Sequence, residues 1–120
     1  MEEESDIVRI RTVDVTPEFE DFYEDLNRDI QEKFKMGIAA LETKKVLSTK
    51  LVKKLVHPPF YEMRISLGNN EYRRVLFALD DRNIILSTKV LLLNGFLKKS
   101  TKDYDKQIKK ALRIIEKYDL

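Results

Sequence analysis

Basic side chains that could bind a phosphate group occur in two successive segments of alternating apolar and polar residues. Arg64 lies in the first segment, and the adjacent residues Arg73 and Arg74 lie in the second. Neighbouring residues of a strand point to opposite faces, so one arginine of the pair is expected beside Arg64 on an open sheet face. Two arginines so placed can bind a phosphodiester through bidentate hydrogen bonds. A solvated strand face with Glu62–Arg64 pairing is an equally good interpretation.

Lysines flank these arginines along the chain. Lys50, Lys53 and Lys54 precede the first alternating segment, and Lys98 and Lys99 follow the apolar stretch LLLNGFL. A lysine can transfer a proton near neutral pH when neighbouring cations lower its pKa from about 10.4. A group of lysines beside two arginines is one arrangement that does this, whereas a single lysine is more often a solvated surface residue.

The absence or scarcity of some residue types excludes several other kinds of site. The chain has no cysteine, which excludes disulfides, thiolate metal sites and a cysteine nucleophile. The single histidine, His57, stands beside two prolines in a predicted loop, without a second histidine for a metal site. The chain has three glycines, which are too few for a glycine-rich loop that binds a nucleotide phosphate. We therefore expect neither a metal ion nor a cofactor. Tyr61 and Phe96 could stack an unpaired base, although a place in the core is the more common role for such residues.

Charge is distributed unevenly over the 120 residues. Residues 1–36 hold 5 Lys/Arg and 12 Asp/Glu, whereas residues 37–120 hold 18 and 9, within a formal net charge of +2. A basic C-terminal part suits a polyanionic ligand.

No apolar run is long enough to span a bilayer, and the N-terminal MEEESD lacks the pattern of a signal peptide. We expect a cytoplasmic protein with one domain, residues 1–120.

Helix signals lie near both ends of the chain. Thr16-Pro17 combines a hydroxyl cap with proline at the first helical position, and an apolar stripe of helical spacing follows. Gly37 is expected to end this helix or to form a tight corner, before a shorter helix over residues 38–47. The segment Ser100-Thr101-Lys102-Asp103 fits a capping box, which predicts a final helix with a basic outer face.

Strand signals alternate with turn signals between these helices. Residues 7–13 predict a strand that exposes Arg9 and Arg11 on one side. Further strands are expected at 61–67, 72–79 and 84–93, the last with a bulge at 87–89. The short turns between them predict an antiparallel meander. The fold class is therefore α+β, with an N-terminal helix pair on one face of the sheet and a C-terminal helix.

The pair Asn94-Gly95 is a strong hairpin signal, because both residues favour tight turns between strands. Only Phe96 and Leu97 follow before the lysines begin, so a second strand is missing. We therefore interpret the stretch as the end of the last strand, where Gly95 lets the backbone bend. Lys98 and Lys99 would then lie at the rim of the basic face.

Several motifs recur in a fixed order along the chain: KKL at 53–55, YEMRI at 61–65, EYR at 71–73, VLFA at 75–78, LLLNGFLKK at 91–99 and the final basic helix. Together they resemble the HigB-type, phage-derived branch of the RelE/ParE toxin superfamily. The resemblance covers nearly the whole chain. It implies a toxin of a type II toxin–antitoxin pair that cleaves mRNA on the translating ribosome without a metal ion. RNA supplies its own nucleophile, the 2′-OH, so an enzyme needs to move protons and stabilise negative charge.

The resemblance implies roles for individual residues. Arg64 and Arg73 match arginines of the family pattern and would bind the scissile phosphate, while Arg74 occupies a position that the pattern leaves variable. Lys53 and Lys54 match the lysines before the strand and would transfer protons. Relatives in other branches use a C-terminal histidine or tyrosine as acid or base, which this chain does not match well. Lys50, Lys98, Lys99 and Phe96 are further candidates for RNA contact.

Two other functions suit the same sequence. One is a ParE-type inhibitor of DNA gyrase on the same fold, because fold does not determine function. The other is a non-catalytic RNA- or protein-binding module. The resemblance also implies partners: a cognate antitoxin, expected to be a helix-turn-helix DNA-binding protein, as well as mRNA and the ribosome. DNA would be contacted only through the antitoxin, and no membrane contact is expected.

Overall fold

The computed structural model describes residues 8–55, 60–67, 71–81, 83–98 and 101–118. The expected Ser100 cap and Lys99 lie outside these residues. Within them, no helix is long and apolar enough to cross a membrane. The elements in chain order are β1 (Thr12–Val15), α1 (Pro17–Glu24), α2 (Arg28–Thr43), β2 (Val52–Lys54), β3 (Tyr61–Leu67), β4 (Glu71–Leu79), β5 (Lys89–Leu97) and α3 (Thr101–Lys117).

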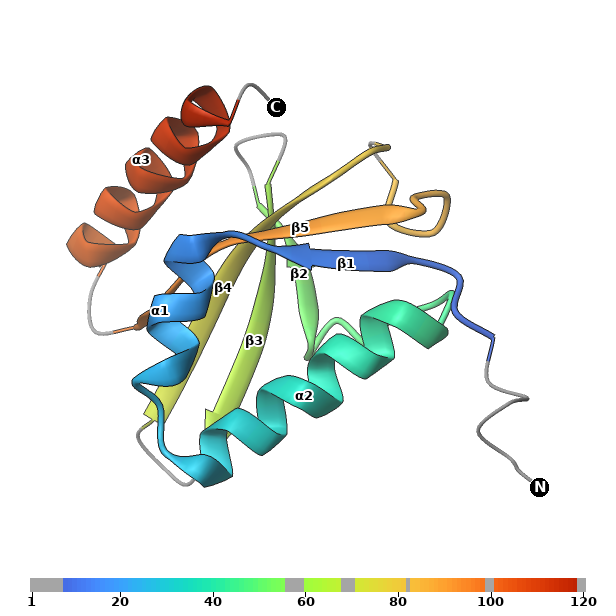
Figure 1. The fold of residues 1–120 in the computed structure, drawn as a ribbon, viewed down its shortest axis with the longest axis horizontal. Coiled ribbons are helices and arrows are strands. Elements are labelled where there is room, and N and C mark those ends of the chain that lie inside the picture. Colours follow the sequence, from blue (N-terminus) through green and yellow to red (C-terminus); the bar gives the residue numbers. More distant parts are fainter. Residues whose placement is uncertain (1–7, 56–59, 68–70, 82, 99–100, 119–120) are drawn as a thin grey trace.

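The strands form one five-stranded sheet in the order β1-β5-β4-β3-β2 (Figure 1). Strands β3 to β5 form the antiparallel meander that the sequence predicted, and the α+β class is confirmed. The short strand β2, which pairs antiparallel with β3, was not predicted. The first strand differs from the expectation: it covers Thr12–Val15 and runs parallel to β5. β1 and β5 are far apart in the chain, so no hairpin turn restricts their relative direction.

The two N-terminal helices divide earlier than predicted. Helix α1 ends at Glu24 with Asp25 as its C-cap, and α2 begins after the extended residue Asn27, whose side chain accepts the backbone N–H of Ile30 at 3.0 Å. Gly37 does not end a helix, since it is buried in the middle of α2. A Cβ there would lie 3.0 Å from the sulfur of Met63, so glycine lets α2 pack closely on β3.

The predicted Thr16 cap at the start of α1 is confirmed, because the Thr16 hydroxyl oxygen accepts the backbone N–H of Phe19.

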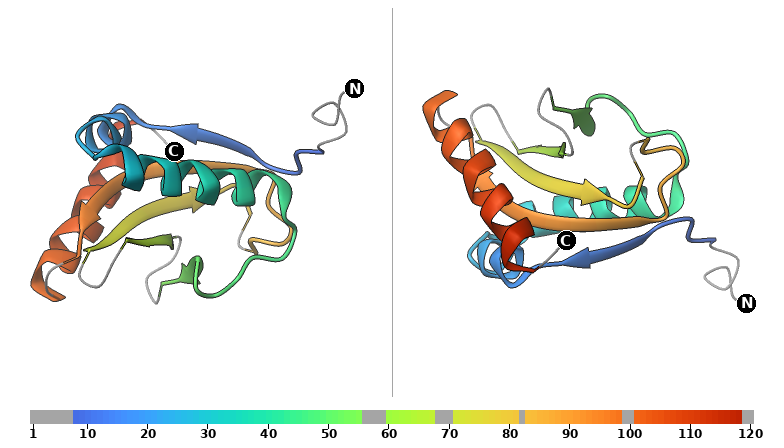
Figure 2. Two further views of the ribbon diagram at one scale, coloured as in Figure 1. Left: turned by 90° about the horizontal axis from the view of Figure 1, so that it is seen from below. Right: turned by 90° about the horizontal axis from the view of Figure 1, so that it is seen from above.

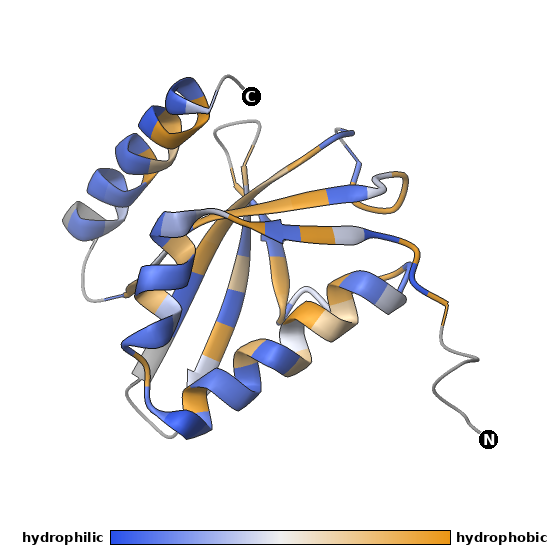
Figure 3. Ribbon diagram, viewed as in Figure 1, coloured by the Kyte–Doolittle hydropathy of each residue, from blue (hydrophilic) through white to orange (hydrophobic). Residues whose placement is uncertain are grey.

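The sheet is covered on both faces, and a separate apolar cluster fills each side (Figures 1 and 2). Helices α1 and α2 pack on one face, through Phe19, Ile30, Phe34 and Leu41. Helix α3 contacts β5 on the other face, through Ala111 and Ile114. Figure 3 shows the matching division of α3 into an apolar side and a hydrophilic outer side.

The pair Asn94-Gly95 lies within β5, which confirms that it is not a hairpin turn. The Asn94 amide donates to Gln107 in α3, to the backbone oxygen at 3.2 Å and to the side-chain oxygen at 3.0 Å. A Cβ at Gly95 would come within 2.3 Å of the Phe22 ring. Glycine is therefore required here for the close approach of α1, rather than for the backbone bend that we expected.

Arg11 was expected to be exposed, and the structure contradicts this. Its side chain is buried at 2% exposure, whereas Arg9 remains exposed. The Arg11 guanidinium donates to the carbonyls of Leu41, Lys44 and Lys45 at 2.6–2.9 Å, and to Ile84 O at 2.7 and 3.1 Å. Burial lowers the pKa of Arg11. One side chain thus joins the end of α2 to the loop before β5.

The loop before β5 replaces the first residues of the strand predicted at 84–93. The Ile84 carbonyl accepts hydrogen bonds from Arg11, and the Asp80 carboxylate accepts the backbone N–H groups of Thr88 and Lys89 at 2.9 and 3.0 Å. Because the Ile84 carbonyl and these two N–H groups have side-chain partners, they do not extend the backbone pairing between β4 and β5. The bulge expected at 87–89 is also absent there, and the register shift lies between Leu76 and Phe77, where β5 contributes the extra residue.

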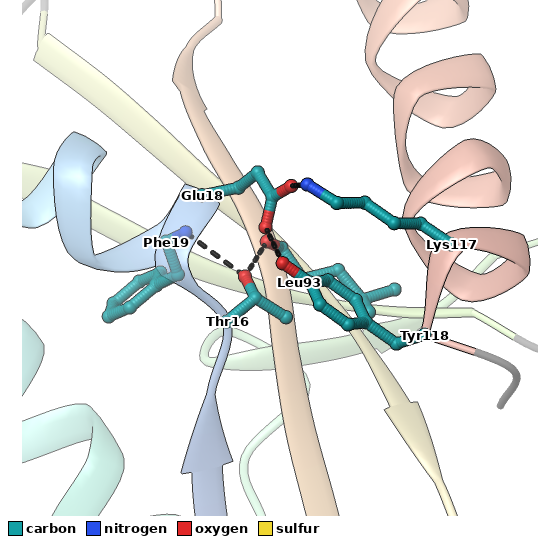
Figure 4. A network of polar contacts seen from close by, with 6 residues as sticks. All are labelled: Thr16, Glu18, Phe19, Leu93, Lys117 and Tyr118. Atoms are coloured by element: carbon teal, nitrogen blue, oxygen red, sulfur yellow. Dashed lines mark hydrogen bonds and ion pairs between the residues drawn. The ribbon is translucent and has the colours of Figure 1, made fainter.

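Helix α3 is also attached to α1 through its last turn (Figure 4). Glu18 accepts from Lys117 Nζ and from the Tyr118 hydroxyl, both at 3.3 Å. Beside them, the Thr16 hydroxyl donates to Leu93 O in β5. The two helices cover opposite faces of the sheet, so these contacts join the two layers at the end of β1.

We predict that Arg11→Lys destabilises the protein by roughly 3 kcal/mol. A lysine keeps the charge but cannot satisfy four carbonyls in different directions, and a buried carbonyl without a donor costs about 1–3 kcal/mol. Urea denaturation measures the change in the free energy of unfolding. The exposed Arg9→Lys is the matched control, and its effect should stay within about 0.5 kcal/mol. Equal stability of the two variants would contradict the structural role of Arg11.

We predict that the Glu18 contacts stabilise the protein at neutral pH and not in acid. Partial burial acts to raise the pKa of Glu18, but its backbone hydrogen bond, Lys117 and Tyr118 together lower it below the usual 4.5. A carboxyl group with a lowered pKa stabilises the fold above its unfolded pKa, and this stabilisation is lost as the pH falls through the folded pKa.

Thermal denaturation of Glu18→Gln checks this dependence. The variant should melt a few degrees below the unsubstituted protein at pH 7, since exposed ion pairs contribute little, and the two should converge near pH 3. Glu20→Gln on the same helix is the control, and it should melt with the unsubstituted protein at both pH values. A difference for Glu18→Gln that is the same at both pH values would disprove the prediction.

Candidate functional site

The face of the sheet that carries α3 also carries a group of charged side chains toward its β2 edge. Strand alternation places Glu62, Arg64 and Arg74 on this face, because Met63, Ile65 and Val75 point into the core beneath α1 and α2. Arg64 and Arg74 are directly paired across β3 and β4. On the edge strand β2, Lys53 pairs with Glu62 and so belongs to the same face.

A hollow of about 250 Å³ lies at this group. It is lined by Lys50, Arg64, Ile65, Ser66 and Arg74. Three of these five residues are cationic, and none is acidic. The Arg64 side chain is about one third exposed (33%), while that of Arg74 is 9% exposed. The hollow is therefore a surface recess with two guanidinium groups in its wall, which suits a phosphate group.

Glu62 lies between the two arginines and is nearly inaccessible, at 1% exposure. Its Oε2 is 3.1 Å from Arg64 Nε and 3.1 Å from Arg74 Nε. The predicted Glu62–Arg64 pair is thus present, but it is not the solvated surface pair that we considered. Sequence reasoning missed Glu62 as a site residue, because the alternating pattern placed it on an open face and gave no sign of its burial.

The structure selects Arg74 rather than Arg73 as the neighbour of Arg64. Arg73 pairs with Ile65 and with Leu97, on the face that α1 and α2 cover. The sequence resemblance had ranked Arg73 above Arg74 for binding phosphate. Adjacent strand residues point to opposite faces, so only the pairing register between β3 and β4 could decide between them.

The candidate lysines, like the candidate arginines, do not all lie on the same face of the sheet. Lys50 lines the hollow, and Lys53 shares its face of the sheet. Lys54 pairs with Tyr61 and therefore points to the other face. Lys98 is exposed directly after β5. The structure thus brings Lys50 to the arginine pair and places Lys53 on the same face of the sheet, whereas Lys54 lies on the other face.

Neither aromatic candidate offers an open ring face for a base. Phe96 is 7% exposed and packs edge-on against Tyr104 of α3, with ring centroids 5.5 Å apart. Tyr61 is 8% exposed and stacks on Phe77 at 5.8 Å. Both belong to the core, which corrects the expectation for Phe96. Within the part of the chain that the structure describes, no three Asp, Glu or His side chains gather as metal ligands would.

Comparison with known proteins agrees with this architecture. The family described as phage derived protein Gp49-like (DUF891) matches residues 21–116, which includes the whole candidate site. The chain belongs to this Gp49-like family. Among curated proteins there is no match.

The Gp49-like chain also shares its fold with the E. coli toxin RelE, solved as an arginine-to-alanine double mutant in the free state. The TM-score is 0.59 at 13% sequence identity, over 84% of this chain and 97% of the RelE chain. Together with the family match, this confirms the resemblance to the RelE superfamily. At this identity the structural match supports the fold, and the activity must be argued from the site.

We predict that Lys50→Ala and Arg64→Ala each weaken binding of a short single-stranded RNA and lower its salt dependence by about one phosphate contact. Both side chains line the hollow. Fluorescence anisotropy across a salt series measures affinity and slope. Arg73→Ala, which changes the opposite face, should have a smaller effect. Larger losses for Arg73→Ala than for Arg64→Ala would place the RNA on the other face of the sheet.

Proposed function

We propose that this Gp49-like protein is the toxin of a type II toxin–antitoxin pair. In this proposal it is a metal-independent endoribonuclease that cleaves mRNA on the translating ribosome. The observation that carries the proposal is the directly paired Arg64 and Arg74, which line one cationic hollow on a RelE-like fold. Family membership and the RelE fold support the assignment as a toxin.

The arrangement suits phosphodiester cleavage by the 2′-OH of RNA. In that reaction the 2′-oxygen forms a bond to phosphorus while the bond to the 5′-oxygen breaks. A base accepts the 2′-OH proton and an acid protonates the departing 5′-oxygen. The phosphate gains negative charge in the transition state, and Arg64 and Arg74 would stabilise it through charge-assisted hydrogen bonds.

Lys53 is the proposed proton-transfer residue, because it shares the face of the arginine pair. A lysine amine can accept or donate a proton in such a reaction. Lys50 would contact the RNA backbone from its place in the wall of the hollow. Lys98, exposed at the end of β5, would contact RNA further along the strand.

The proposed function requires a partner that controls toxicity. We propose a cognate antitoxin, a helix-turn-helix protein that binds DNA and covers or distorts the cationic hollow. DNA would be contacted only through that protein. The ribosome would supply the mRNA in a fixed conformation, so that the toxin needs few base-specific contacts of its own.

Induction in growing bacteria, followed by sequencing of mRNA 5′ ends, tests the activity. The unsubstituted protein should stop growth and produce cuts inside translated regions. Arg64→Ala and Arg74→Ala should each reduce cleavage by about 100-fold, as expected for loss of a group that stabilises transition-state charge. Arg9→Ala is the matched control, because Arg9 is an exposed arginine on another part of the molecule.

A gyrase supercoiling assay distinguishes the ParE-type alternative. DNA breaks in that assay, together with intact mRNA after induction, would replace the nuclease proposal by gyrase inhibition. Salt-sensitive RNA binding without toxicity or cleavage would leave a non-catalytic binding module instead.

A further inference from the structure

Glu62 is a buried carboxylate that the proposed cleavage reaction does not use directly. It is 1% exposed, so its oxygens are out of reach of a bound RNA in this conformation. Oε2 contacts Nε of both Arg64 and Arg74. Oε1 is buried and has no hydrogen-bond partner among the described residues. A charge buried with one oxygen unmatched is costly, and such groups in native proteins commonly have a specific role.

The geometry indicates what this carboxylate does for the arginines. Directly paired residues on neighbouring strands have Cβ atoms about 5 Å apart, so the two guanidinium charges repel each other at short range. One carboxylate oxygen at 3.1 Å from both Nε atoms offsets that repulsion. The group of three side chains keeps a net charge of +1, which is still attractive to phosphate.

The contact with Glu62 also determines which nitrogen atom of each guanidinium faces the carboxylate. A guanidinium has five N–H donors. Arg64 Nε donates a hydrogen bond to Glu62 Oε2, and Arg74 Nε lies 3.1 Å from the same oxygen as an ion pair. Arg74 Nη1 is placed in addition by Arg73 O at 3.3 Å. For Arg64, whose side chain is one third exposed and lines the hollow, the Nε contact restricts the orientation of the guanidinium at the place where a phosphate would bind.

We propose that Glu62 is a positioning residue, which holds Arg64 and Arg74 side by side in the orientation that binds the transferring phosphate. This inference rests on the proposed nuclease function. Glu62 acts through the arginines and touches neither RNA nor a reacting atom. Its removal should therefore impair the chemical step more than ribosome binding, because the cations remain but are no longer aligned.

Single-turnover cleavage of mRNA on purified ribosomes tests the role of Glu62. Glu62→Gln preserves the shape of the side chain and removes its charge. The maximal cleavage rate should fall by roughly 10- to 100-fold, since a misplacement of about 1 Å can cost about 100-fold in rate. The toxin concentration that gives half the maximal rate should change less than threefold, roughly, since net attraction to RNA is not reduced. Glu32→Gln, at an exposed carboxylate paired with Lys35, is the control and should cleave normally.

The two proposals fail in different ways. If the unsubstituted protein does not cleave, the nuclease proposal is wrong. If it cleaves and Glu62→Gln cleaves equally fast, or loses only ribosome affinity, the positioning role is wrong while the nuclease proposal stands.

A second measurement covers the case in which Glu62→Gln does not fold. In the unsubstituted protein, ¹⁵N NMR should detect a slowly exchanging Nε–H signal for Arg64, assigned by its absence in Arg64→Lys, because this Nε donates to Glu62 although the side chain is one third exposed. Rapid exchange of this signal with solvent would overturn the proposed positioning, because it would mean that the carboxylate does not hold the Arg64 guanidinium.

Discussion

The pairing register between β3 and β4 is the constraint on which both the core and the candidate site depend. It places Met63 opposite Val75 beneath α2 and, one residue further along, Arg64 opposite Arg74 on the other face. A slip of one residue in either strand would exchange its faces, burying arginines in the apolar core. Hydrophobic burial on one face therefore fixes the geometry of the cations on the other.

Buried charged side chains position groups that apolar packing alone does not hold in place. Arg11 satisfies carbonyls from the end of α2 and from the loop before β5, two segments without regular pairing to each other. Glu62 similarly lies 3.1 Å from Nε of both Arg64 and Arg74, which stand on neighbouring strands. In both places a single buried ionic side chain contacts groups from more than one element of the fold.

The comparison with RelE illustrates how little sequence identity this fold needs. At 13% identity the arrangement of helices and strands is retained over most of both chains. A fold of this kind can host different activities, so the function has to be judged at the site. Here the site is a cationic recess whose two arginines stand on neighbouring strands, with Lys50 contributed by the turn before β2. Strand positions hold side chains in reproducible directions, which suits a reaction that depends on the placement of charge.

The sequence by itself determined the α+β class, β3 at 61–67, the start of α1 at Thr16 and the basic character of the site. These follow from local patterns: alternation, capping residues and charge. Only the tertiary structure decided that Arg74 and not Arg73 accompanies Arg64, that Glu62 and Arg11 are buried, and that Gly37 lies inside a helix. Gly95 likewise owes its place to the Phe22 ring from a distant helix. Each depends on which segments meet across the sheet, and contacts between distant segments leave no periodic signal in a single sequence.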